Sequence, residues 1–147
     1  MPSARLIVCE KTGHWAGLFR RALAGREVLA ETRSLAECGR QLGASPASVV
    51  AVEVTAGNLE AILRTLPRWS AEYARARFLA LTTRELAAAE SLLREAGTLA
   101  VLQCAADVPL AVRLAHRHLA LAPAAELPWR EALLARLPWA SLPRPAG

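Results

Sequence analysis

Short apolar runs alternate with amphipathic stretches along most of this chain. The apolar runs cover residues 5–10, 27–32, 48–54, 77–82 and 98–104. Continuous apolar runs of this length, bounded by turn residues, are typical of strands that are buried on both faces of a parallel sheet. Each run is followed by residues in which apolar side chains recur at helical spacing. The pattern predicts five strand–helix units, and the alternation within the second run is that of an edge strand.

Several helix starts carry capping signals. Ser34 and Glu37 have the spacing of a capping box, and Thr82 and Glu85 repeat that spacing after the fourth run. Asp107 precedes the last helical stretch and is expected to cap it. These residues predict that helices begin directly after the second, fourth and fifth strands.

Glycine and proline mark where helices are expected to end. The helix after the first run is predicted to end at Gly25. Asn58 is predicted to cap the helix after the third run, and Pro67 is predicted to end it, because proline removes a helical hydrogen bond. Trp69 and Tyr73 then fall in a connector that leads to the fourth strand.

Five alternating units require right-handed crossovers, which place helices on both faces of one sheet. The sequence therefore predicts an α/β three-layer sandwich with a five-stranded parallel sheet in the order 2-1-3-4-5, a flavodoxin-like architecture. This domain is expected to cover residues 1–123. Residues 124–147 are expected to form a short C-terminal helix and a tail rich in proline and tryptophan.

The C-terminal segment carries candidate partner-binding residues. Trp129, Leu133 and Leu137 share one face of the expected short helix, and Trp139 follows them. Tryptophan is a common anchor at protein interfaces. Packing of the same residues on their own domain is the alternative.

Charge and composition narrow the classes of partner. The chain has 147 residues, 18 of them basic and 13 acidic, with a formal net charge of +5. The basic residues are scattered and accompany no recognition motif, so nucleic acid is not a favoured partner. No run reaches the roughly 18 apolar residues of a membrane span, and the N-terminus lacks the pattern of a signal peptide. We expect one domain in the cytoplasm, with no membrane contact.

The three cysteines predict no covalent framework. Cys9, Cys38 and Cys104 are odd in number, and none belongs to a closely spaced pair. The spacing indicates neither disulfides nor a zinc site. We expect the thiols to be small buried hydrophobic groups, and we expect no metal ion and no cofactor.

Residues at the ends of the predicted strands resemble, by position, the site of the receiver domain of bacterial response regulators. Cys9 and Glu10 occupy the positions of the receiver's first acidic residues, and Glu53 occupies that of the phospho-accepting aspartate. Thr82 stands at the hydroxyl position, and Cys104 stands where a receiver has lysine. The resemblance implies a signal-transduction module with a degenerate site.

The departures from the receiver pattern bear on phosphorylation. Formation of an acyl phosphate needs a metal ion to neutralise the phosphoryl group and a cation to hold it. Cys104 has neither the charge nor the reach of lysine. Glu53 has two interpretations: it imitates a phosphorylated aspartate by accepting a hydrogen bond from Thr82, or it is the solvated end of a strand.

The sequence therefore predicts a pseudo-receiver that is not an enzyme and is not phosphorylated in the usual way. It would act as a protein–protein interaction or regulatory module, whose partner is another protein or a second copy of the chain. The alternative is a small-ligand-binding domain that uses the crevice at the carboxyl ends of the first and third strands. Glu10, His14 and Glu53 would line that crevice.

Overall fold

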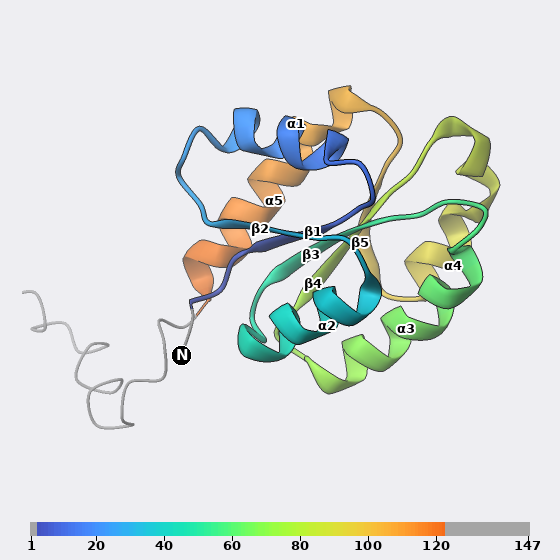
Figure 1. Ribbon diagram of the computed structural model, residues 1–147, viewed down its shortest axis with the longest axis horizontal. Coiled ribbons are helices and arrows are strands. Elements are labelled where there is room, and N and C mark those ends of the chain that lie inside the picture. Colours follow the sequence, from blue (N-terminus) through green and yellow to red (C-terminus); the bar gives the residue numbers. More distant parts are fainter. Residues whose placement is uncertain (1–2, 123–147) are drawn as a thin grey trace, which may run out of the picture.

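A parallel five-stranded sheet forms the centre of the molecule in the computed structural model, which describes residues 3–122 (Figure 1). Its strands lie in the order β2-β1-β3-β4-β5, and every neighbouring pair is parallel. The predicted fold class and strand order are confirmed. The strands are β1 (Leu6–Cys9), β2 (Leu29–Thr32), β3 (Val49–Glu53), β4 (Arg77–Leu81) and β5 (Thr98–Leu102).

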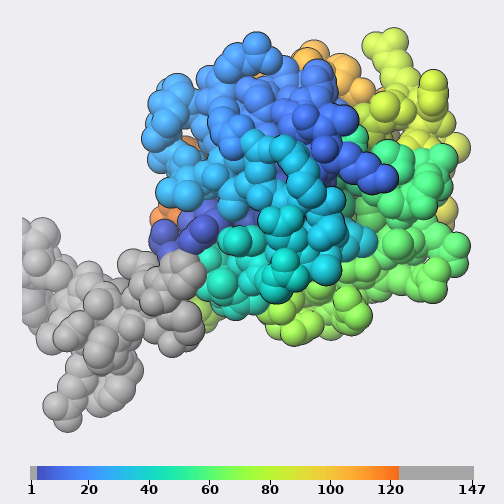
Figure 2. All heavy atoms as spheres, in the orientation of Figure 1, coloured from blue at the N-terminus to red at the C-terminus, as the bar shows by residue number. Residues whose placement is uncertain are grey.

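Helices cover both faces of this sheet. Figure 1 shows α1 and α5 on one face and α2, α3 and α4 on the other. The α-helices are α1 (His14–Leu23), α2 (Leu35–Ala44), α3 (Leu59–Glu72), α4 (Glu90–Glu95) and α5 (Val108–Leu121), and the short 3-10 helices are η1 (Arg84–Ala89) and η2 (Ala105–Asp107). In the space-filling view, atoms of α1, α2 and α3 largely hide the strands (Figure 2).

Alternation along each strand divides the core into two clusters. In β1, Ile7 and Cys9 face α2 and α3, whereas Leu6 and Val8 face α1 and α5. The other central strands divide their side chains in the same way, because successive residues of a strand point to opposite faces. Both faces are apolar, and this explains why the strands read as continuous apolar runs.

The predicted end of the third helix is wrong. α3 continues through Pro67 to Glu72, so Trp69 lies in the helix and not in a connector. Pro67 is on the exposed side, while Trp69 is 4% exposed and stacks on Phe78 with ring centroids 6.3 Å apart. Burial of an indole ring favours the last turn by more than the missing hydrogen bond at proline costs it.

The predicted caps are correct only in part. The Ser34 hydroxyl accepts a hydrogen bond from the Glu37 backbone N–H at 3.2 Å, as expected. After β4, the capping box does not form: Thr83, the N-cap residue that precedes η1, makes no side-chain cap, and an α-helix begins only at Glu90. Asp107 also does not cap α5; its carboxylate accepts hydrogen bonds from the backbone N–H groups of Gln103 and Cys104, which follow β5.

The C-terminal predictions fall on residues 123–147, outside the described residues. Trp129, Leu133, Leu137 and Trp139 belong to that segment. Among residues 3–122, no helix is both long and apolar enough to span a bilayer.

Candidate functional site

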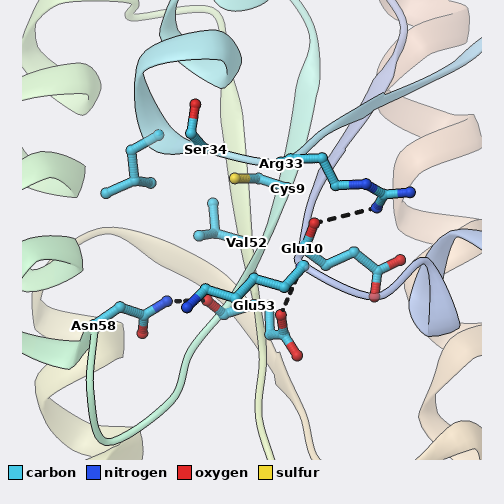
Figure 3. A pocket seen from close by; sticks show the side chains of 9 residues that line it. Cys9, Glu10, Arg33, Ser34, Val52, Glu53 and Asn58 are labelled. Carbon is cyan, nitrogen blue, oxygen red and sulfur yellow. Dashed lines mark hydrogen bonds between the residues drawn. The ribbon is translucent and has the colours of Figure 1, made fainter.

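A cavity of about 220 Å³ opens at the carboxyl ends of β1 and β3. This is the position at which the chain order in the sheet reverses, where α/β folds of this kind bind ligands. Figure 3 shows its side chains. The lining residues are Cys9, Glu10, Lys11, Arg33, Ser34, Leu35, Val52, Glu53 and Asn58. The predicted crevice therefore exists, with Glu10 and Glu53 in its wall. The prediction for His14 is wrong, because His14 does not line the cavity; it is exposed and lies edge-on to Trp15.

Glu10 follows β1 directly, and its carboxylate is already bound. One oxygen accepts a hydrogen bond from the Trp15 backbone N–H at 2.9 Å, and the other accepts one from Ala16 N–H at 2.7 Å. Figure 3 shows its side chain turned away from Glu53 toward α1. Glu10 is 2% exposed, so it serves as a buried anionic cap for the first turn of α1.

Glu53 ends β3 at the position of the receiver's acceptor aspartate. Its Oε2 accepts a hydrogen bond from the Lys11 backbone N–H at 3.0 Å, which ties the end of β3 to the loop after β1. Asn58 fixes the following loop, because its Nδ2 donates to the Glu53 carbonyl at 2.9 Å and its Oδ1 accepts from Thr55 N–H at 2.7 Å. Asn58 therefore braces the loop and makes no side-chain cap for α3.

Thr82 does not reach toward Glu53. Its hydroxyl donates its one proton to the Leu102 carbonyl at 3.0 Å, and this hydrogen bond links the residue after β4 to the last residue of β5. If Glu53 imitated a phosphorylated aspartate, it would accept a hydrogen bond from Thr82, and the structure shows no such bond between these two residues. Cys104 lies beyond β5, with its sulfur 3.7 Å from a carboxylate oxygen of Asp107.

Two cationic residues lie at the cavity. Lys11 and Arg33 both line it. The Arg33 guanidinium donates to the Glu10 carbonyl at 3.2 Å and to Glu31 Oε2 at 2.7 Å, so it joins the ends of β1 and β2. Sequence patterns gave no reason to single out Arg33, because its partners come from two other elements.

Cys9 and Cys38 form a pair of neighbouring thiols on the α2 side of the sheet. Both cysteines belong to the core cluster on this face, and each thiol shifts the pKa of the other. The hydrogen bond from the Cys38 thiol lowers the pKa of Cys9 to about 7 and, together with burial, raises the pKa of Cys38. Cys9 also lines the cavity, with its sulfur under the start of α2 in Figure 3. Sequence spacing did not reveal this pair.

The residues at this site do not fit the divalent cation of a working receiver. Magnesium binds at carboxylate oxygens and retains several waters. Both oxygens of Glu10 accept backbone N–H groups at the start of α1, and one oxygen of Glu53 accepts another. Within residues 3–122, no three histidine, cysteine, aspartate or glutamate side chains are grouped so that they could hold a metal ion.

The fold is that of CheY-like receiver domains. A CheY-like protein (TadZ) from Pseudomonas aeruginosa PAO1 matches with a TM-score of 0.64 and 14% identity, over 78% of this chain and 98% of that one. An orphan response regulator of H. pylori matches with a TM-score of 0.62 and 15% identity, over 80% and 99%. A response regulator from Burkholderia pseudomallei with a phosphorylated aspartic acid matches with a TM-score of 0.57 and 18% identity, over 90% and 84%. No protein-family model and no curated protein sequence matches the chain.

Proposed function

We propose that this chain is a pseudo-receiver: it has the receiver fold, transfers no phosphoryl group, and regulates a partner protein by contact. The observation that carries the proposal is the position of the Glu10 carboxylate. Its two oxygens accept hydrogen bonds from Trp15 N–H and Ala16 N–H. The carboxylate that would hold a metal ion in a receiver therefore stabilises the first turn of α1 here.

The remaining receiver positions support the same function. Glu53 stands in place of the acceptor aspartate, and its carboxylate is bound to the backbone of Lys11. Cys104 stands in place of the lysine and brings no positive charge. The switch hydroxyl of Thr82 is bound within the sheet. Phosphoryl transfer depends on charges arranged around the phosphoryl group, and these residues do not arrange them.

A partner surface is supported at the β5 edge of the sheet. We define the β5 surface as Leu92, Leu99 and Leu110, which come from α4, β5 and α5. These side chains are 50%, 46% and 50% exposed. Leu99 lies where the register between β4 and β5 shifts, so its side chain stands outside the regular pairing. Isolated exposed leucines are ordinary, but three from elements that contact one another favour a protein interface.

A phosphorylation assay tests the first half of the proposal. The full chain is incubated with acetyl phosphate and magnesium, and its intact mass is measured beside a receiver known to be phosphorylated under these conditions. We expect no phosphoryl adduct. We also expect none on Glu53→Asp, because the Glu10 oxygens still bind α1. An adduct on the parent chain would refute the proposal, and an adduct on the variant would refute the role given to Glu10.

A binding assay tests the second half. The full chain is used to capture proteins from its own host, beside a Leu92→Ala/Leu99→Ala/Leu110→Ala variant and a Val28→Ala control. Val28 is 57% exposed and precedes β2, at the opposite edge of the sheet. A protein retained by the parent and the control but lost by the triple variant supports the β5 surface. Equal retention by all three chains contradicts it, and no retained protein contradicts the regulatory function.

The cavity supports a second candidate function, the binding of a small ligand. Its volume of about 220 Å³ lies below that of pockets for drug-sized ligands, so it would admit only a smaller molecule. Its wall combines the apolar Leu35 and Val52 with the cationic residues Lys11 and Arg33 and the acidic residues Glu10 and Glu53. A thermal-shift screen of small anionic metabolites checks this candidate, because a ligand that binds only the folded chain raises its melting temperature. The rise should disappear in Arg33→Ala if the cavity is the site.

A further inference from the structure

We propose that Cys9 and Cys38 form a reversible intramolecular disulfide when the chain meets a hydroperoxide, with Cys9 as the thiol that reacts first. The thiol pair is thus an oxidation site at the wall of the cavity. This proposal does not depend on the identity of any partner.

The fold brings the two sulfurs together from different elements. Cys9 is the last residue of β1 and points to the face covered by α2, and Cys38 lies on the buried side of α2. Both side chains are buried in the core cluster on the α2 side of the sheet, and each thiol shifts the pKa of the other. A disulfide needs sulfurs and Cβ atoms that are already close, because strained bridges are easily reduced. The contact between β1 and α2 supplies that closeness in the folded chain.

The environment of the pair assigns different roles to the two cysteines. Cys9 is 6% exposed and lines the open cavity, so a small oxidant can reach it. Its lowered pKa, about 7, gives it thiolate character, and the thiolate is the reactive form. Cys38 is 0% exposed and lines no wall of the cavity. Cys9 is therefore the attacking thiol, and Cys38 is the resolving thiol.

The oxidation has two steps. The Cys9 thiolate attacks one oxygen of the hydroperoxide, the O–O bond breaks, and the departing alkoxide takes up a proton to become an alcohol. Cys9 is then a sulfenic acid. The Cys38 sulfur attacks the Cys9 sulfur, the S–O bond breaks, and the departing hydroxide takes the Cys38 proton as water. Two thiols lose two electrons in total, and the hydroperoxide is reduced to alcohol and water.

The third cysteine cannot take either role. Cys104 follows β5, and β3 and β4 separate β5 from β1 in the sheet. A disulfide between Cys9 and Cys38 joins β1 covalently to α2, whose first residue, Leu35, also lines the cavity. Oxidation would thus fix one wall of the cavity in place.

Peptide mapping tests the proposal on the full chain. The folded protein is treated with hydrogen peroxide, the peroxide is removed, and the chain is unfolded, alkylated at its free thiols and digested with trypsin. Cleavage after lysine and arginine separates the three cysteines into peptides 6–11, 34–40 and 95–113. We expect a link between peptides 6–11 and 34–40, with peptide 95–113 alkylated, and we expect dithiothreitol to restore alkylation of all three.

Two variants and one condition complete the test. Cys104→Ala should form the same link, whereas Cys38→Ala should stop at a sulfenic acid on Cys9, which dimedone traps. The link should form at least about tenfold faster in the folded chain than in urea, because the fold holds the thiols together. A link that includes peptide 95–113, full alkylation of peptides 6–11 and 34–40 after treatment, or equal rates in folded and unfolded chains each overturns the proposal. The results from the parent chain decide the matter even if Cys38→Ala does not fold.

Discussion

Replacement of Glu10 by glutamine should destabilise the fold strongly, although it changes few atoms. The Glu10 carboxylate is 2% exposed and accepts hydrogen bonds from Trp15 N–H and Ala16 N–H through separate oxygens. Glutamine keeps one acceptor oxygen and places an N–H₂ group against the other backbone donor. One buried N–H then has no acceptor, and the negative charge at the start of α1 is lost.

The size of the effect follows from these two losses. A hydrogen bond to a charged group contributes about 1.5–3 kcal/mol, and a charge at a helix terminus contributes up to about 1 kcal/mol in ordinary sites. The free energy of unfolding should therefore fall by about 2–4 kcal/mol. For a folded domain of this size, each kcal/mol lowers the melting temperature by roughly 4 °C.

Urea unfolding followed by tryptophan fluorescence measures this change, because Trp15 and Trp69 are buried in the two core clusters. Glu53→Gln is the matched control: that carboxylate accepts one hydrogen bond, from the Lys11 backbone N–H, at a half-buried position, and its loss should lower the free energy of unfolding by less than about 1 kcal/mol. If Glu10→Gln unfolds within about 0.5 kcal/mol of the parent chain, the carboxylate does not cap α1 and the reasoning on the site is wrong.

Three further predictions concern the backbone and the thiol pair. Pro67→Ala should raise the free energy of unfolding by about 1–2 kcal/mol in urea, because it restores a helical N–H to α3 and loses part of that gain through a more flexible unfolded chain. Gly97→Ala should lower the free energy of unfolding in urea by more than Gly25→Ala does. Gly25→Ala should lower it by about 1–2 kcal/mol through its positive φ alone, whereas at Gly97 the added Cβ would also lie 2.6 Å from Ser70 Oγ. Equal losses of free energy in the two variants would contradict this prediction. Alkylation of Cys9 in the folded chain should accelerate as pH rises through about 7, because the thiolate forms above its lowered pKa; a midpoint near 9 would contradict the hydrogen bond from its neighbour.

Local patterns predicted the sheet because every strand of the core is apolar on both faces. The alternation with helices and the handedness of crossovers predicted a parallel sheet covered on both faces, and the order 2-1-3-4-5 was predicted as that of flavodoxin-like folds. The prediction was wrong where a tertiary contact opposed a local rule. Pro67 is a helix breaker in isolation, but the stacking of Trp69 on Phe78 keeps α3 intact beyond it.

At the candidate site, too, the sequence predicted the positions of residues but not their contacts. Sequence position placed Glu10, Glu53, Thr82 and Cys104 at the carboxyl ends of the strands, because parallel strands all end at one edge of the sheet. It could not say which atoms each side chain meets. Thr82 donates across to Leu102, which belongs to the neighbouring strand, and the register of that pair is a property of the folded sheet.

The sequence by itself determined the α/β class and the departures from a receiver's acidic and basic positions, since these depend on residue type and periodicity. Only the tertiary structure decided that the Glu10 carboxylate is bound by α1, that Arg33 joins two strand ends, and that the thiols of Cys9 and Cys38 meet. The physical reason is that a hydrogen bond or a thiol contact depends on angstrom-scale distances between elements. Packing of those elements sets these distances, and hydrophobic periodicity does not record them.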